Sequence, residues 1–215
     1  MSDTLSLEKL TIYCADIGSV SNNRFGWARI VGNQEYMNNC IVDFVDDIAS
    51  AIAKGHKVAL GFECPLWVPV STKPQCLTKG RRVDGNRPWS AGAGTAVLAT
   101  GITQVAWILD RLRSQLNERR AALPAVHLNW SEFVDSESAL FFWEAFVTGK
   151  AKDSRSEHAK DALIACREFA GRLPDPTEKC NPEPQVRSLI GGAILWAGWS
   201  TDLNLLHMPS VVVRP

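Results

Sequence analysis

Two short apolar runs, each ending beside an acidic residue, constrain the fold of this chain more than any other feature. Residues 9–17 (KLTIYCADI) and 57–63 (KVALGFE) are rich in apolar side chains, and the acids at their ends are Asp16 and Glu63. Apolar runs of this length between turn signals are typical of buried strands. Because residues 9–17 lack clean alternation, we expect them to be buried on both faces. They should form a central strand flanked by the second and fourth strands.

The rest of the chain alternates between strand and helix patterns. The spacing of apolar residues predicts further strands at residues 24–32, 35–43, 124–130 and about 207–213. The same spacing, together with capping residues and glycines, predicts helices at residues 45–55, 93–120, 136–149 (capped by Gly149) and 155–171 (capping box Ser154 and Glu157). Three strands, a helix and a strand form the opening order of a mixed α/β sheet. The proline-rich residues 64–92 are expected to form a long loop, which in a compact domain is usually functional or disordered.

Length and composition set the scale of the fold. The chain has 215 residues, of which 46% are hydrophobic and 21% charged. These fractions are close to those of ordinary globular proteins and argue against disorder. We predict a single domain over residues 1–215, with a C-terminal extension from about residue 173.

The sequence also carries signals about location and partners. The polar N-terminus does not resemble a secretory signal, and no apolar run approaches the roughly 18 residues that span a bilayer. The six cysteines show no CxxC spacing. We therefore expect a cytoplasmic protein with free thiols and no membrane partner. The apolar segment 188–199 is a candidate contact surface for a homo-oligomer.

Three acids occupy positions that favour a metal site. Asp16 and Glu63 end predicted strands, and Asp161 lies in the helix expected at residues 155–171. Ligands gather where the strands of an open sheet end, and Mg²⁺ or Mn²⁺ prefers carboxylate oxygens. We expect these carboxylate oxygens within about 4–8 Å of one another, close enough to share one or two ions. His158 shares a helix face with Asp161, so it is a further candidate ligand or proton-transfer partner.

Each acid also has a purely structural explanation. Asp16 could be a turn residue that accepts backbone N–H groups, and Asp161 could be a solvated helix residue. Glu63 is harder to explain in this way, because it closes an apolar strand next to a proline. Glu144 lies in an apolar stretch and is expected to be a helix residue that pairs with a nearby base.

The predicted loop concentrates positive charge. The chain has 23 basic and 23 acidic residues, a balance that counts against nucleic-acid binding, but residues 73–87 carry five basic side chains and one acid. Arginine guanidinium groups suit phosphates, and neighbouring aromatic rings suit unstacked bases, so this loop could bind nucleic acid. The alternative is that its basic side chains are solvated and form salt bridges to the rest of the protein. The candidate substrate-binding residues in this loop are Lys79, Arg82, Arg87 and Trp89, whereas Lys73 and Arg81 complete the basic set.

Several short motifs resemble a known family. Four motifs together resemble a family of predicted ribonuclease H-like nucleases: Asp16-Ile17-Gly18, Gly26-Trp27-Ala28, the segment Arg81–Arg87 and His158–Ala162. The last of them also resembles a motif of bacterial Holliday-junction resolvases. The resemblance spans roughly residues 9–172, and Glu63-Cys64-Pro65 replaces the commoner Asp-x-Pro of that family. It implies a ribonuclease H-like mixed five-stranded sheet flanked by helices. It also implies a nuclease in which Asp16, Glu63 and Asp161 hold Mg²⁺ or Mn²⁺ and nucleic acid is the substrate.

Two other function classes stay open. Asp16-Ile17-Gly18-Ser19 resembles the first phosphate loop of actin and sugar-kinase proteins, although those proteins bind nucleotide between two such domains. A binding or scaffold protein that keeps the fold without catalysis is the other alternative, favoured by the neutral charge. Metal binding would distinguish the nuclease from the scaffold, and ATP binding would identify the kinase-like alternative.

Overall fold

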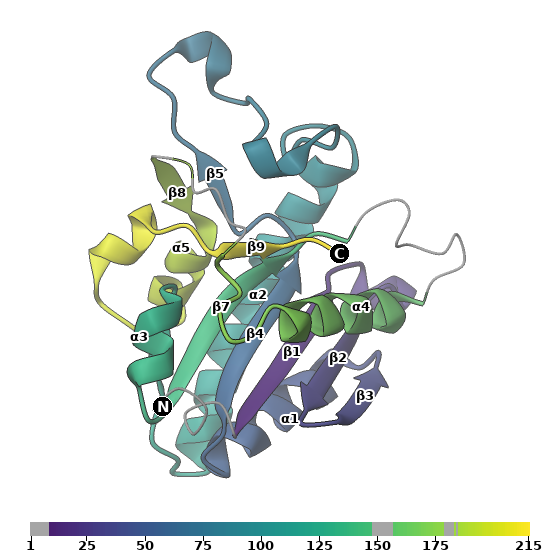
Figure 1. Cartoon of the computed structure of the whole chain (residues 1–215), viewed down its shortest axis with the longest axis vertical. Helices are drawn as coiled ribbons and strands as arrows, with labels where there is room; N and C mark the ends of the chain where they lie inside the picture. The colour runs from purple at the N-terminus through teal and green to yellow at the C-terminus, as the bar shows by residue number, and fades with distance from the viewer. Residues whose placement is uncertain (1–8, 148–156, 179–182, 184) are drawn as a thin grey trace.

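A mixed sheet forms the centre of the computed structural model, which describes residues 9–147, 157–178, 183 and 185–215 (Figure 1). Seven strands in the described parts join one sheet: β1 (Leu10–Asp16), β2 (Gly26–Val31), β3 (Gln34–Asn38), β4 (Lys57–Glu63), β6 (Ala125–His127), β7 (Ala139–Ala145) and β9 (Val211–Val213). Their order is β3-β2-β1-β4-β7-β6, and β9 also pairs with β7. The sheet therefore has seven strands where five were expected.

Strand β1 lies inside the sheet, as predicted. It pairs antiparallel with β2 and parallel with β4, and β4 is parallel to β7. All seven residues of β1 are buried, because helices cover both faces of the sheet. Tyr13 and Ala15 belong to the hydrophobic core on one face, and Ile12 and Cys14 to the core on the other.

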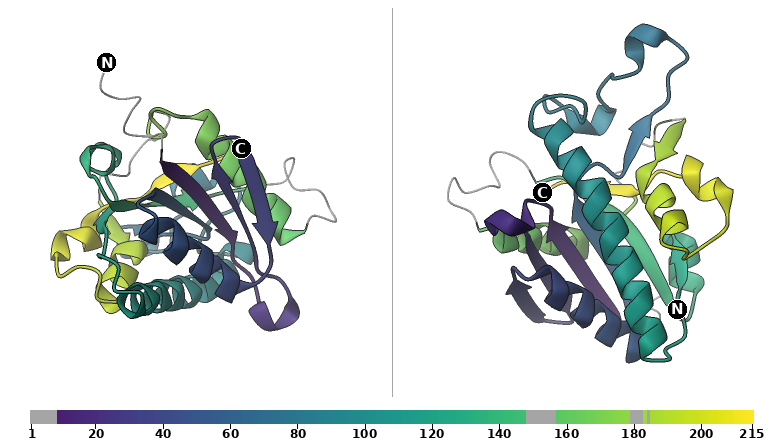
Figure 2. Two further views of the ribbon diagram at one scale, coloured as in Figure 1. Left: turned by 90° about the horizontal axis from the view of Figure 1, so that it is seen from below. Right: turned by 180° about the vertical axis from the view of Figure 1, so that it is seen from behind.

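Helices form a layer on each side of the sheet (Figure 2). One core contains side chains from α1, α2 and α5, and the other contains side chains from α3 and α4. The α-helices of the described residues are α1 (Ile41–Ala53), α2 (Ala93–Glu118), α3 (Trp130–Asp135), α4 (His158–Gly171) and α5 (Leu189–Trp196). Short 3₁₀ helices span Val20–Asn22, Pro74–Cys76, Arg82–Asp84 and Leu203–His207. An α/β architecture with a mixed sheet is therefore confirmed.

The prediction of a helix over residues 136–149 was wrong, because Ala139–Ala145 form strand β7. Every residue of this strand is buried. A run that is apolar on both faces shows neither helical nor strand periodicity, so the pattern could not discriminate between the two. Its aromatic content is typical of a strand. Gly149, the expected cap, lies outside the described residues.

Several predicted strands are shorter in the structure, and the one expected at about 207–213 spans only Val211–Val213. The strand expected at 35–43 ends at Asn38, whose side-chain oxygen accepts from the backbone N–H groups of residues 39 and 40 before α1 begins. This local turn ends the strand. The strand expected at 124–130 ends at His127, because the Asn129 side chain caps α3. Ser154 of the predicted capping box lies outside the described residues, and α4 begins at His158.

The predicted long loop has more structure than expected. Within residues 64–92, β5 (Trp67–Pro69) pairs antiparallel with β8 (Val186–Ser188), and the rest of the loop projects beyond the sheet (Figure 1). The chain after residue 172 adds β9 to the main sheet and α5 to its core. The two segments therefore pack together at one end of the sheet.

The cysteines of the described residues are the free thiols that were expected. The five cysteines in the described parts of the chain are free thiols, and Cys180 lies outside those parts. Within the same parts, none of the helices has the length and apolar character that crossing a membrane requires.

Candidate metal centre

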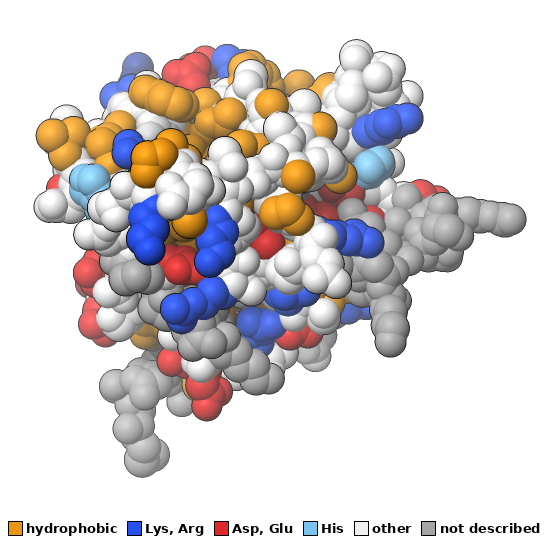
Figure 3. All heavy atoms as spheres, turned by 90° about the horizontal axis from the view of Figure 1, so that it is seen from above, with side chains coloured by type: hydrophobic (Ala, Val, Ile, Leu, Met, Phe, Trp, Pro, Cys, Tyr) orange, Lys and Arg blue, Asp and Glu red, His pale blue; other side chains and the backbone are white. Residues whose placement is uncertain are grey.

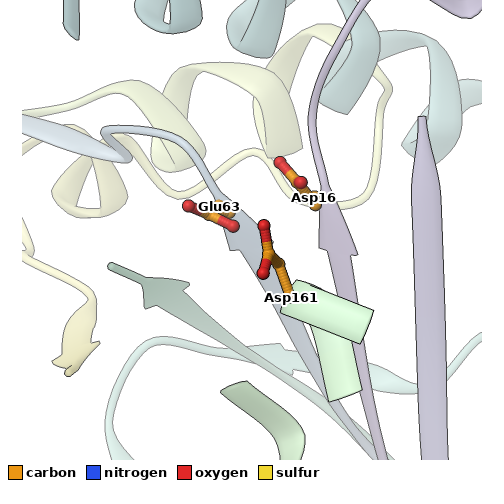
Figure 4. Close-up of side chains that lie close together, drawn as sticks. All are labelled: Asp16, Glu63 and Asp161. Carbon is orange, nitrogen blue, oxygen red and sulfur yellow. The ribbon is translucent and has the colours of Figure 1, made fainter. Parts of the chain in front are cut away.

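Three carboxylates meet at the end of the central strands (Figure 4). Asp16 and Glu63 are partners in the parallel β1–β4 register, so they stand side by side where the two strands end. Asp161 reaches the same place from the first turn of α4. One ligand oxygen from each of the three residues lies within 4.8 Å of the others. The predicted distance of about 4–8 Å is therefore confirmed.

Gly26 allows α4 to come close enough to deliver Asp161. It is the β2 partner of Asp16 in the antiparallel register. A Cβ atom at Gly26 would lie 2.2 Å from the backbone nitrogen of Ala159, and real Cβ atoms essentially never come so close to backbone. Only glycine therefore permits this contact between β2 and the start of α4. The Gly26-Trp27-Ala28 motif thus has a structural role in the site.

Helix α2 closes the site from the opposite face of the sheet. A Cβ atom at Gly101 would lie 2.6 Å from the Cβ of Cys64, so this glycine lets the helix approach the end of β4. Gln104 in the same helix donates from Nε2 to the backbone oxygen of Gly18, at 2.7 Å. The turn after Asp16 and the residue after Glu63 are both held by this helix.

The site is largely withdrawn from solvent. Asp16 is 4% exposed, Asp161 is 2% exposed and Glu63 is half-buried. Buried charges of like sign are costly unless a positive charge or hydrogen bonds compensate them. Nδ1 of His158 lies 2.6 Å from Oδ2 of Asp16. This set of hard oxygen donors fits Mg²⁺ or Mn²⁺.

The neighbouring thiol has a different character. Burial raises the pKa of Cys64 well above its ordinary value, and the nearby carboxylates of Glu144 and Glu63 raise it further. The thiol therefore stays protonated at neutral pH, whereas a metal ligand or nucleophile must be a thiolate. The chemistry available at this site is that of carboxylates and imidazole.

A pocket of about 430 Å³ opens next to Glu63. Of the four predicted substrate-binding residues, Arg87 and Trp89 line it. The exposed side chains of Arg82 and Lys79 are not part of its lining. Arg82 has a side chain that is 72% exposed, with Nε 4.0 Å from Oε1 of Glu183. The structure thus places two of the four residues in the pocket that Glu63 also lines.

Arg81 and Glu144 form a buried ion pair. The pairing of Glu144 with a base was predicted, but its partner and its burial on a strand were not. Nη2 of Arg81 lies 2.6 Å from Oε1 of Glu144, and Nε of Arg81 donates to Oδ1 of Asp84 at 2.8 Å. All three side chains are essentially fully buried. Burial by itself would lower the pKa of Arg81, but the two carboxylates raise it above its ordinary value, so the guanidinium stays charged. Arg81 is therefore not part of an exposed basic patch, and Glu144 is not a helix residue.

This ion-pair cluster fixes the loop to the sheet. Oε2 of Glu144 accepts from the backbone N–H of Leu66, and Arg81 donates from Nη1 to the backbone oxygen of Trp67. Oδ2 of Asp84 accepts from the backbone N–H of Trp89. In the sequence, the position of Glu144 inside an apolar run was the signal for this buried ion pair, because a buried charge needs a partner of opposite sign.

Comparison with family models, with curated proteins and with solved structures gave no match to this chain. The resemblance to the ribonuclease H-like nucleases therefore stays a prediction. The geometry of the carboxylates and of the adjoining pocket is the basis for assigning a function.

Proposed function

We propose that this chain is a divalent-metal-dependent nuclease of ribonuclease H-like fold, which hydrolyses phosphodiester bonds in nucleic acid. The observation that carries the proposal is the approach of the Asp16, Glu63 and Asp161 carboxylates to within 4.8 Å. These acids end the first and fourth strands and begin a late helix, the arrangement on which the family resemblance rests. The three residues would hold Mg²⁺ or Mn²⁺.

The remaining residues of the site have defined parts in this chemistry. A bound divalent ion lowers the pKa of a coordinated water and stabilises negative charge on the leaving oxygen. His158 would orient the Asp16 carboxylate through the contact between Nδ1 and Oδ2. Arg87, in the pocket next to Glu63, would neutralise a phosphate of the substrate.

A cleavage assay tests the proposal. Labelled single-stranded and duplex DNA and RNA are incubated with the protein in Mg²⁺, in Mn²⁺ and in chelator. We expect cleavage only with a divalent ion, and its loss in Asp16→Asn and Asp161→Asn. Asp110→Asn, an exposed acid on α2, is the matched control and should retain activity. Absence of cleavage together with absence of Mn²⁺ binding would favour a scaffold, and ATP binding would favour the kinase-like alternative.

A further inference from the structure

The pocket next to Glu63 has the size of a small-ligand site. Its volume of about 430 Å³ is within the roughly 300–1,000 Å³ typical of such pockets. It lies between the 64–92 loop, the first turn of α2 and the residues that follow β7. The end of the molecule where this loop projects carries apolar and basic side chains together (Figure 3). A pocket of this volume has room for one small ligand.

The lining combines an apolar wall with a few polar groups. Trp89 provides an indole ring, and the apolar wall consists of Pro65, Pro88, Val97, Phe146 and Val147. Such a surface suits the flat face of a nucleobase, because every base can stack on an aromatic ring. Asn86 adds an amide that can hydrogen-bond to the edge of a base.

Positive charge in the pocket comes from Arg87. Its exposed guanidinium has no ion-pair partner within the described residues, in contrast to Arg81, which Glu144 and Asp84 neutralise. The first turn of α2, which also lines the pocket, has no acidic residue and no side-chain cap. The helix dipole therefore adds to the preference for an anion. An anionic group near Arg87 would lie at the same end of the sheet as the carboxylates.

Trp89 is held rigidly in this wall. Its backbone N–H donates to Oδ2 of Asp84, and its Nε1 donates to the backbone oxygen of Lys79, both at 3.1 Å. Asp84 is in turn fixed by Arg81, which pairs with Glu144 on β7. A ring fixed before binding loses little freedom when a ligand stacks on it. Trp89 is therefore linked through Asp84 and Arg81 to β7, the strand next to β4, which carries Glu63.

We propose that this pocket receives a single unpaired nucleotide, with its base against Trp89 and its phosphate between Arg87 and the three carboxylates. This inference rests on the proposed function, since it names the substrate class of the same site. The nucleotide belongs either to a strand, as a single-stranded or extruded residue, or to a free nucleoside monophosphate. In the first case the protein prefers strands with an unpaired nucleotide, because a perfect duplex must first be unpaired at a cost.

Binding without catalysis tests this inference. With Ca²⁺ in place of Mg²⁺, so that a divalent ion still offsets the charge of the carboxylates, fluorescence anisotropy compares a perfect duplex, the same duplex with one unpaired nucleotide, and the corresponding single strand. Gel electrophoresis after the measurement checks that each ligand is intact. We expect the two unpaired ligands to bind about tenfold more tightly than the duplex, and Trp89→Ala to remove most of that difference. Trp89→Phe should keep most of it. Trp196→Ala is the matched control, because this tryptophan on α5 is 73% exposed and does not line the pocket.

Two further measurements complete the test. Arg87→Gln should weaken all three ligands to a similar extent and reduce the slope of affinity against salt by about one, as expected for a phosphate contact. Competition by a nucleoside monophosphate distinguishes the two sources of the ligand. Competition at an affinity equal to that of the strand would assign the pocket to free nucleotides, and weak competition would assign it to a strand.

The outcomes separate this inference from the proposed function. Equal binding of duplex and unpaired ligands, unchanged in a folded Trp89→Ala or Trp89→Phe variant, would overturn the pocket assignment even if metal-dependent cleavage is found. A preference for unpaired nucleotides that depends on Trp89, without any metal-dependent cleavage, would support the pocket assignment and overturn the nuclease. A thermal melt of each variant shows that it is folded.

Discussion

Nδ1 of His158 lies 2.6 Å from Oδ2 of Asp16 and joins the start of α4 to the end of β1. The side chain of His158 is 35% exposed and that of Asp16 is 6% exposed, so the histidine is the more accessible partner of this contact. In metal sites, a group that hydrogen-bonds to a ligand fixes the orientation of that ligand. Removal of such a group typically weakens metal binding by about 10–100-fold.

We therefore predict that His158→Ala weakens Mn²⁺ binding by about tenfold, the low end of that range, because the histidine is partly exposed. A calorimetric titration with Mn²⁺ measures the change. His127→Ala is the control, since His127 interacts with Ser136 and Glu132 away from the carboxylates. An unchanged Kd in His158→Ala would show that the contact has no role in holding a metal.

Gly26→Ala should disturb both the fold and the site. The added Cβ would lie 2.2 Å from the backbone nitrogen of Ala159, and backbone cannot rotate away as a side chain can. Overpacking of this kind typically costs about 1–3 kcal/mol. Because α4 must move away from β2, Asp161 moves with it. We expect a loss of about 2 kcal/mol in the free energy of unfolding together with weaker Mn²⁺ binding.

Gly171→Ala is the matched control for this variant. Gly171 is the last residue of the same helix, and a Cβ atom there would meet nothing within 4 Å. Alanine lowers the conformational entropy of the unfolded chain relative to glycine. We therefore expect the free energy of unfolding to rise by at most about 1 kcal/mol. Urea denaturation measures both variants. Equal stability of the two would mean that the close contact at Gly26 is not required.

Glu144→Gln should destabilise the protein strongly. Removal of one partner from a buried ion pair usually costs about 3–5 kcal/mol, because the other charge is left inside the protein. Asp84 still neutralises part of the Arg81 charge, so we expect about 3 kcal/mol. Urea denaturation provides the measurement. Glu35→Gln, which removes an exposed pair with Arg167, should leave the denaturation midpoint nearly unchanged.

The carboxylate trio could be predicted because each of its members follows from local sequence. Apolar runs that end in acids specify where β1 and β4 stop, and a parallel pairing of the two strands then places Asp16 next to Glu63. The helical pattern around Asp161 identified the third acid and its neighbour His158. Local sequence alone left Asp161 open between a metal ligand and a solvated helix residue, and the chain order of the three acids favoured the ligand.

The features that sequence reasoning missed depend on contacts between distant residues. Strand β7 is buried on both faces, so its pattern could not be distinguished from that of a helix. The β5–β8 pairing joins segments more than a hundred residues apart, and no local signal specifies it. The basic side chains of residues 73–87 were predicted to form one positive patch, but Arg81 is buried whereas Arg82 and Arg87 are exposed. Only the three-dimensional position of Glu144 determines which arginine is neutralised.

Tyr13 provides a prediction about pH. Burial and the hydrogen bond that its hydroxyl donates to Asp47, at 2.5 Å, raise the pKa of Tyr13 above its ordinary value. A raised folded-state pKa means that the folded protein holds this proton more tightly than the unfolded chain does. The resulting stability is fully present below about pH 10, the pKa in the unfolded chain, and decreases as the pH rises above it.

In a Tyr36→Phe background, Tyr13 is the remaining tyrosine. We expect tyrosinate absorbance to appear only together with alkaline unfolding, as followed by circular dichroism. Ionisation of Tyr13 near pH 10 in a protein that is still folded would contradict the buried hydrogen bond to Asp47.

Mn²⁺ should reverse the order of the melting temperatures of the wild type and Asp16→Asn. The three clustered carboxylates repel one another, and a divalent ion that binds only the folded state should stabilise it by about 2.7 kcal/mol at a hundredfold excess over Kd. Asp16→Asn relieves part of the repulsion and removes a ligand. This variant should therefore melt at or above the wild-type temperature in chelator and below it in Mn²⁺.

Thermal melts of both proteins in each condition, with Asp110→Asn as the control, measure this reversal. A wild-type melting temperature that does not change in millimolar Mn²⁺ would contradict the metal site, because ion binding to the folded state must raise it.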